Sequence, residues 1–157
     1  MTPVTGPNEL SVTRFIECSP EAVWTAWVTR TEDWFTPRPW TTKVDFDLRT
    51  GGRADVVMTS PEGESHSYRG VFLEVVPNRR IVSTGAMTEG WIPQAGDMNF
   101  VRIDTFEPEG NGTRYTARAL HWDEKAAATH REMGFEHGWG LVADQLAEIA
   151  LHLNSAT

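Results

Sequence analysis

The five histidines are the side chains best suited to metal binding in this sequence, and their spacing does not favour a metal site. They form neither an HxH nor an HExxH pattern. Zinc needs ligands that converge from one side and are held by further hydrogen bonds. The most suggestive run, His130 to Glu136 and His137, places both histidines on the solvent side of a predicted helix. We therefore predict no metal and no other cofactor. The histidines are His66, His121, His130, His137 and His152.

Nucleophile and phosphate motifs are also missing from the sequence. There is no GxSxG elbow, and Cys18 precedes a short helix where nothing nearby would activate its thiol. The stretch "RTGGR" lacks the lysine and the following helix of a phosphate loop, so we interpret it as a turn between strands. A catalytic triad assembled from distant residues stays open, because such groups converge only in three dimensions.

Acid–base chemistry has three candidates, Glu132, His121 and Tyr115. Glu132 falls in the same sector of a predicted helix as its apolar stripe. In an apolar cavity its carboxyl would have a raised pKa and could act as a general acid or base. The competing interpretation, which we favour, is that Glu132 reaches the helix edge and pairs with an arginine, since Glu is rarely buried. Glu132 and His121 are the first catalytic candidates.

Aromatic side chains favour a binding pocket more strongly than any catalytic motif. The chain has seven tryptophans and seven phenylalanines but two tyrosines, and several of the rings lie in irregular segments, 34–40 and 86–96. Apolar pockets with few polar groups are the usual form of small-molecule sites. Packing in the core remains the alternative for each single ring. The predicted ligand-binding residues are Trp27, Trp34, Phe35, Trp40, Trp91, Tyr115, His121, Phe135 and Trp139.

The elements that must position these residues are strands with a helix near each end. Ser19 and Pro20 are typical of the start of a helix, which we expect over 19–28, and two prolines limit 31–40 to a turn or two. Alternation and turn residues predict strands over 10–17, 42–49, 53–60, 65–76, 79–85, 97–107 and 112–121. Segment 86–96 is long for a link between strands, and either folds back on the core or acts as a lid.

The final segment, from Asp123 to about Leu153, is predicted to be one helix. Gly134, Gly138 and Gly140 weaken its front half. Either they allow close packing around a large ring, or they leave room for a cavity between helix and sheet. We favour the cavity, because Ala117 and Ala119 on the last strand are also small. The inner stripe is predicted to contain Ala128, Phe135, Trp139, Val142, Leu146, Ile149 and Leu153.

The inward face of two strands is ambiguous. In 97–107 one face carries Met98, Phe100, Arg102, Asp104 and Phe106, while the other carries Asn99, Val101, Ile103 and Thr105, so each is half apolar. If Arg102 and Asp104 point inward they must be paired. We expect them on the surface instead. His66 and Tyr68, in 65–76, pose the same ambiguity.

Composition bounds the function classes. A chain of 157 residues predicts a single domain, here 10–157 after a flexible N-terminal arm at 1–9. The net charge of −8 argues against nucleic-acid and anionic-membrane partners. The N-terminus does not resemble a secretory signal, and a single cysteine fits a reducing compartment, so we expect a cytoplasmic protein.

Several motifs together resemble a known superfamily. They occur in order along residues 10–153 and are "FIECSPEAVWTAWV", "DFDLRTGGR", "YRGVFLEVVPNRRIV", "TEGWIP" and "MGFEHGWGLVADQLAEI". The chain resembles the START-like (SRPBCC) superfamily, in particular bacterial single-domain homologues of the activator of the heat-shock chaperone ATPase. The resemblance implies an α+β, helix-grip (START/Bet v-like) fold, in which an antiparallel β-sheet wraps around a long C-terminal α-helix. The members that activate the chaperone carry an additional N-terminal domain, so we do not expect that activity here.

The sequence leaves three functional hypotheses. The first, which we favour, is a binding protein whose partner is a small apolar or aromatic molecule held between sheet and helix. The second is an acid–base enzyme, of cyclase or hydrolase type, in the same cavity. The third is a protein-interaction or chaperone-associated module, in which His130, His137 and Leu141 form an outer contact face, for example in a homodimer.

Overall fold

The computed structural model describes residues 6–96 and 99–155, in which a five-stranded antiparallel sheet is the largest element. The first strand pairs with the last, and their register joins Glu9 to Leu120 and Ile16 to Thr113. In sheet order the strands are β1 (Glu9–Ile16), β10 (Gly112–His121), β9 (Phe100–Glu109), β6 (Arg80–Thr84) and β5 (Val71–Val76).

The strands between α2 (Thr31–Trp34) and β5 form a second, three-stranded sheet. It contains β2 (Thr41–Phe46), β3 (Ala54–Thr59) and β4 (Ser65–Tyr68), and an isolated bridge from Arg53 to Val71 links the two sheets. The single strand predicted over 65–76 is divided at Gly70. A Cβ atom at Gly70 would lie 2.6 Å from the carbonyl oxygen of Thr84, so only glycine permits this crossing of the backbones.

The N-terminal helix forms where the capping residues predict it. In α1 (Pro20–Thr29) the Ser19 side chain accepts a hydrogen bond from the Ala22 amide, at 3.2 Å, and proline occupies the first turn. α2 (Thr31–Trp34) is a single turn, as expected before the prolines. α1 packs against both β9 and the C-terminal helix.

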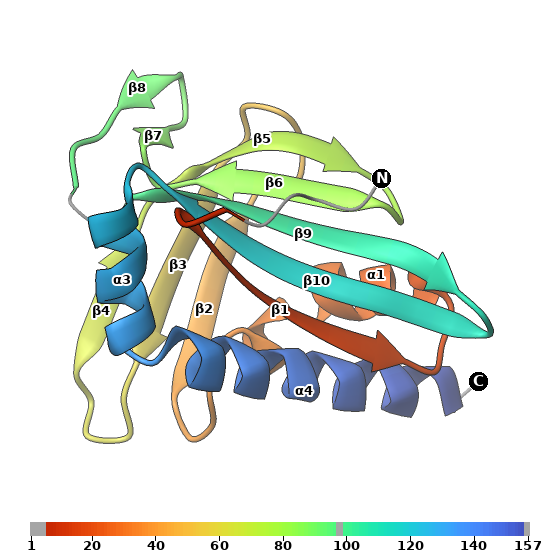
Figure 1. The fold of residues 1–157 in the computed structure, drawn as a ribbon. Helices are drawn as coiled ribbons and strands as arrows, with labels where there is room; N and C mark the ends of the chain where they lie inside the picture. Colours follow the sequence, from red (N-terminus) through yellow and green to blue (C-terminus); the bar gives the residue numbers. More distant parts are fainter. Residues whose placement is uncertain (1–5, 97–98, 156–157) are drawn as a thin grey trace.

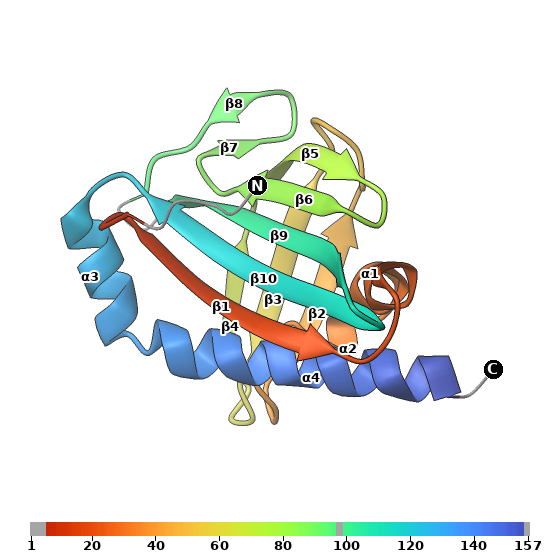
Figure 2. The same ribbon diagram turned by 45° about the vertical axis from the view of Figure 1, so that its right-hand side comes forward.

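The predicted final helix is two helices, α3 (Glu124–Glu132) and α4 (Phe135–Ser155). Gly134 between them has φ +94°, a left-handed conformation that glycine adopts without strain. The break changes the direction of the chain, so α3 stands at one end of the sheet while α4 runs alongside β1 and past α1 (Figures 1 and 2). Ala128 therefore leaves the predicted stripe and is exposed.

The core lies between the five-stranded sheet, α1 and α4, which is the predicted α+β helix-grip architecture. The buried part of the α4 stripe includes Phe135, Val142, Leu146 and Ile149. The largest fully buried side chains are Trp27, Trp34, Tyr115, Phe72, Phe106, Phe135, Ile16, Ile81 and Leu146.

The predicted N-terminal arm falls partly outside the described residues, which begin at Gly6. Glu9 is the first residue of β1, and its buried carboxylate pairs with Arg118. Among the described residues, no helix is both long and apolar enough to span a membrane.

Candidate functional site

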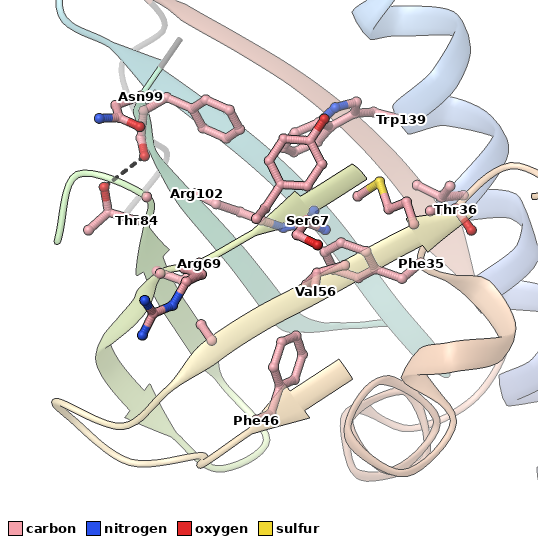
Figure 3. A pocket seen from close by; sticks show the side chains of 18 of the residues that line it. Phe35, Thr36, Phe46, Val56, Ser67, Arg69, Thr84, Asn99, Arg102 and Trp139 are labelled. Atoms are coloured by element: carbon pink, nitrogen blue, oxygen red, sulfur yellow. Dashed lines mark hydrogen bonds between the residues drawn. The ribbon is translucent and has the colours of Figure 1, made fainter. Parts of the chain in front are cut away.

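A cavity of about 880 Å³ lies between the two sheets and the N-terminal half of α4 (Figure 3). Most of its wall is apolar or aromatic, and small residues occupy the strands opposite the helix. Such a combination is typical of small-molecule sites. The apolar and aromatic part of the wall comprises Trp27, Phe35, Pro37, Phe46, Ala54, Val56, Met58, Tyr68, Phe72, Phe100, Met133, Trp139 and Val142.

Three of the nine predicted ligand-binding residues lie in this wall. Trp27 comes from α1, Phe35 from the end of α2, and Trp139 from the first turns of α4. Figure 3 shows Phe35 and Val56 near the middle of the pocket, with Trp139 toward the top of the view and Phe46 toward the bottom. The structure therefore brings together rings from distant parts of the sequence.

The other predicted rings lie elsewhere. Trp34 is fully buried behind the wall, and its indole nitrogen donates to the carbonyl of Trp27 at 3.3 Å. Phe135 is buried against Trp139, with ring centres 4.4 Å apart. Trp40 stacks on His66 outside the cavity wall.

Segment 86–96 folds into a small hairpin, β7 (Met87–Thr88) and β8 (Ile92–Pro93). Trp91 is in its turn, half exposed, with its ring near Gly51. Only Gln94 of this segment reaches the cavity wall, where its side-chain amide donates to the carbonyls of Arg69 and Gly85. The hairpin thus forms part of the rim of the cavity and does not cover it.

The first catalytic candidate, Glu132, does not face the cavity. It is the last residue of α3 and is exposed, which agrees with the favoured interpretation of a position at the helix edge and goes against the alternative of a carboxylate in the cavity. The physical reason is the break at Gly134, because α3 and α4 no longer share one helical phase. Among the described residues, the wall contains no carboxylate.

A buried ion pair forms the polar centre of the site. Arg102 lies in the wall, and Asp104 accepts hydrogen bonds from its Nε and Nη2 at 2.8 and 3.1 Å. The Asp104 carboxylate, with 0% of the residue exposed, also accepts from the Tyr115 hydroxyl at 2.5 Å and the Trp27 indole at 3.4 Å. The prediction that Arg102 and Asp104 lie on the surface is wrong, since β9 turns this face inward.

Two aromatic rings hold the Arg102 guanidinium from either side. Its central carbon lies 4.8 Å from the centre of the Phe35 ring and 4.5 Å from that of Trp139. Such cation–π contacts strengthen when they are shielded from water. Figure 3 shows the side chain extending from β9 toward these two residues. Phe35 and Trp139 therefore fix the position of the cation as well as lining the cavity.

The pKa values in this cluster follow from burial and charge. Burial, the largest single influence, lowers the pKa of Arg102, but the charge and hydrogen bonds of Asp104 together with those of Tyr115 outweigh it, so the net pKa is raised. Burial, followed by the neighbouring Asp104 charge, raises the pKa of the Tyr115 hydroxyl well above its ordinary value. The cluster is therefore an ion pair of Arg102 and Asp104 beside a tyrosine hydroxyl that keeps its proton at neutral pH. Tyr115 thus supports the wall from behind without lining it.

Two histidines form a hydrogen-bonded chain next to Trp139. His121, at the end of β10, has its Nδ1 2.9 Å from the carbonyl oxygen of Asn8 and its Nε2 2.9 Å from Nδ1 of His130. His130 lies in the cavity wall, whereas His121 is buried behind it. The prediction that His130 faces solvent is therefore wrong, again because α3 has its own phase.

Desolvation, and then the nearby His121, lower the pKa of His130 to about 4. The imidazole is therefore neutral at physiological pH. A neutral ring can donate one hydrogen bond and accept another, but it is a weak base. No group of three or more histidine, cysteine, aspartate or glutamate side chains suited to a metal ion occurs in the described residues.

The cavity opens between β4 and the turn that joins α3 to α4. Tyr68 and Met133 both line the cavity, yet they are among the more exposed large hydrophobic residues, at 56% and 70%. Exposed apolar side chains at the edge of an apolar cavity are typical of an entrance. Arg69 lies on the same rim, 4.0 Å from Asp55.

Sequence reasoning missed Arg102 and His130 as site residues. Phe100 and Phe106 on the same face of β9 were the available signal for Arg102, but the opposite face was equally apolar. The sequence carries no comparable signal for His130, whose placement depends on the angle between two helices.

Comparisons with known proteins agree with this architecture. A family model described as Activator of Hsp90 ATPase homolog 1-like protein matches residues 17–150. A crystal structure of a protein from Nitrosomonas europaea is 32% identical, covers 98% of this chain and 100% of its own, and has a TM-score of 0.89. A search among curated proteins found no match.

More distant structures share the fold alone. A protein from Arthrobacter aurescens is 21% identical over 93% of this chain and 87% of its own, with a TM-score of 0.80. The AHSA1 protein from Silicibacter pomeroyi is also 21% identical, over 92% of this chain and 99% of its own, with a TM-score of 0.67. Proteins with this START-like fold often bind small molecules.

Proposed function

The chain belongs to the family of activator of Hsp90 ATPase homolog 1-like proteins, and within it we propose that this protein binds a small apolar or aromatic molecule in the cavity between sheet and helix. The carrying observation is the cavity itself, about 880 Å³ lined mainly by apolar and aromatic side chains around one anchored guanidinium. The volume lies in the usual range for ligand pockets, roughly 300–1,000 Å³.

The arrangement of the wall supports the proposal that the cavity is a binding site and not a poorly packed part of the core. Protein interiors are normally filled to the density of organic crystals, so a large apolar void is unfavourable unless a ligand occupies it. Phe35 and Trp139 present ring surface to this space, and Arg102 between them provides hydrogen-bond donors. A bound molecule would restore dispersion contacts that these side chains otherwise lack.

The first test is native mass spectrometry of freshly purified protein, with denaturation and identification of any released molecule. We expect a discrete small molecule, or, for an empty protein, saturable binding of the neutral dye N-phenyl-1-naphthylamine. Failure of both would refute the proposal. The same spectra test the predicted homodimer through the mass of the intact protein.

A cavity-filling variant links the binding to this site. A Cβ atom at Gly138 would have no neighbouring atom within 4 Å, and Gly138 lies in the cavity wall, so a leucine there fits the helix and occupies the cavity. We expect Gly138→Leu to weaken dye binding at least tenfold. His137→Leu, a change at the adjacent exposed position of α4, is the matched control and should bind like the wild type.

An acid–base enzyme in the same cavity is the second candidate, and the position of His130 is the observation that favours it. Its imidazole is the titratable base in the described wall, with His121 behind it. In that case a His130→Gln variant would bind the released molecule yet lose turnover. Unchanged turnover in this variant would refute the enzymatic role of His130.

A further inference from the structure

Two hydrogen-bonding groups of opposite character both lie next to Trp139 in the cavity wall. The Arg102 guanidinium lies over the face of the Trp139 ring, 4.5 Å from its centre. The His130 ring meets the same indole at 79°, with ring centres 5.9 Å apart. The Trp139 ring also packs against Phe135, with ring centres 4.4 Å apart, so a ligand would meet this cluster from the cavity side. A ring-shaped molecule in the cavity would therefore have a donor and an imidazole within the same part of the wall.

Arg102 can donate hydrogen bonds to a ligand, but its positive charge is already balanced by Asp104. Its hydrogen bonds to Asp104 use Nε and Nη2, and the Tyr115 hydroxyl also interacts with the guanidinium. Nη1 donates to no carbonyl or carboxylate of the described residues. Asp104 is fully buried beside it, so its carboxylate already neutralises the guanidinium. A second carboxylate, brought in by a ligand, would leave one uncompensated negative charge in an apolar cavity, which is costly. A neutral carbonyl oxygen would accept from Nη1 without that cost.

The hydrogen-bond chain makes His130 an acceptor toward the cavity. The Asn8 carbonyl can only accept, so Nδ1 of His121 carries the hydrogen, and its Nε2 holds a lone pair when the ring is neutral. His130 then donates to that lone pair through Nδ1, and its own Nε2 remains as an acceptor. A ligand hydroxyl could donate to it.

We propose that the ligand is a neutral, ring-containing molecule that presents a carbonyl oxygen to Arg102 and a hydroxyl group to His130. The inference rests on the proposed binding function and adds a rule of selectivity. Neutral carbonyl compounds bind, and the corresponding carboxylates are rejected, because Asp104 has already compensated the cation. The hydroxyl contributes separately, through the imidazole chain that ends at Asn8.

Matched probes test the two poles of the proposed site, the Arg102 donor and the His130 acceptor. The assay measures displacement of N-phenyl-1-naphthylamine at pH 8. The probes are 6-hydroxy-2-acetonaphthone, its carboxylate analogue 6-hydroxy-2-naphthoate, 2-acetonaphthone without the hydroxyl, and the hydrocarbon 2-ethylnaphthalene. At this pH the carboxylate is ionised and an ordinary imidazole is neutral. We expect the hydroxy ketone to bind at least tenfold more tightly than the carboxylate, and several-fold more tightly than 2-acetonaphthone.

Two variants assign the selectivity to the named residues. Asp104→Asn leaves Arg102 with an uncompensated charge, so it should bind 6-hydroxy-2-naphthoate at least tenfold more tightly than the wild type does. His130→Phe keeps a ring in place but removes the acceptor, so it should erase the advantage of the hydroxy ketone over 2-acetonaphthone. His137→Phe, on the exposed side of α4, is the control and should keep both preferences.

The outcomes separate this inference from the proposed function. If 2-ethylnaphthalene and the ketones bind but the carboxylate binds equally well or better, the selectivity rule is wrong and the binding function stands. If neither the dye nor any probe binds, both are refuted. Should Asp104→Asn fail to fold, the His130→Phe comparison alone can still overturn the two-pole model, by leaving the advantage of the hydroxyl unchanged.

Discussion

The two halves of α4 lie against the same sheet but in opposite surroundings. From Ala143 onward the helix packs on β1 and α1, and Ala143, Leu146 and Ala150 are almost completely buried. In the first two turns, Gly138 and Trp139 line a cavity instead. One helix therefore closes the core at one end of the molecule and leaves it open at the other.

Residue size explains the difference. At the packed end, large buried side chains such as Trp34 and Ile16 belong to α2 and β1, which both contact the helix. At the open end the strands carry small residues in the wall, among them Ala54, Ser67, Gly70, Ser83, Thr84 and Gly85. Small residues opposite a helix leave a gap unless something else fills it. The packed end holds α4 in place, which keeps the open end from collapsing onto the sheet.

The largest expected effect comes from Asp104, where the two ends meet. Replacing it with asparagine leaves the buried Arg102 without a counter-charge, and loss of one member of a buried pair costs about 3–5 kcal/mol. We expect Asp104→Asn to lower the free energy of unfolding in urea by that amount. Glu109→Gln is the control, because its pair with Arg114 is exposed and such pairs contribute at most about 1 kcal/mol. Equal losses in both variants would contradict the assignment.

A second pair of variants compares the two ends directly. Leu146 is 0% exposed at the packed end, so Leu146→Ala should cost about 2–5 kcal/mol in urea unfolding. Met133, 70% exposed at the entrance, loses little burial on truncation, so Met133→Ala should stay within about 0.5 kcal/mol of the wild type. A large loss at Met133 would mean that the entrance is closed by packing.

The open end should also respond to acid. His130 has a folded-state pKa of about 4, below the ordinary value of 6.5, so the unfolded chain binds its proton first. Its contribution to stability is complete above about pH 6.5 and is lost as the pH falls through about 4. Because the ring is only half buried, we expect on the order of 1–2 kcal/mol.

The measurement is the difference in unfolding free energy between wild type and His130→Phe, from pH 7.5 down to 4. The difference should shift in favour of the variant as the pH falls. The change is specific if His137→Phe, at the exposed histidine of α4, parallels the wild type throughout. A constant difference across this range would show that His130 titrates normally.

The fold was predictable because its signals are local. Ser19 and Pro20 mark the start of α1, and turn residues such as Pro77 and Asn78 mark the hairpins. The apolar stripe of α4 also follows from spacing alone, from Val142 to Ile149. Each of these depends on a few neighbouring residues and on no distant contact.

The site was less predictable because it depends on angles and on pairing. The break at Gly134 moved His130 inward and Glu132 outward, and glycine content alone does not say whether a helix bends, narrows or breaks. Arg102 and Asp104 face inward because they neutralise each other, with Tyr115 and Trp27 adding hydrogen bonds from other elements. Those partners lie far apart in the sequence, so spacing could not reveal them.

Alanine at each of the three glycines of the open end should give small effects on stability that differ in sign. Gly134 has φ +94°, so Gly134→Ala should cost about 1–2 kcal/mol. Gly138 is helical with open space around a new Cβ, so Gly138→Ala should stabilise by about 0.5–1 kcal/mol. At Gly140 the new Cβ would lie 2.8 Å from Nη2 of Arg14, a flexible side-chain end paired with Asp144.

Displacing Arg14 costs little, since that pair is exposed, so Gly140→Ala should fall between the other two, near zero. Thermal or urea unfolding of the three variants gives the order 138, 140, 134 from most to least stable. Each glycine would then have a separate role: Gly134 breaks the helix, Gly138 leaves the cavity open, and Gly140 admits Arg14. A loss of stability in Gly138→Ala would instead mean that the helix needs glycine there for packing, and that the open end is tighter than its cavity implies.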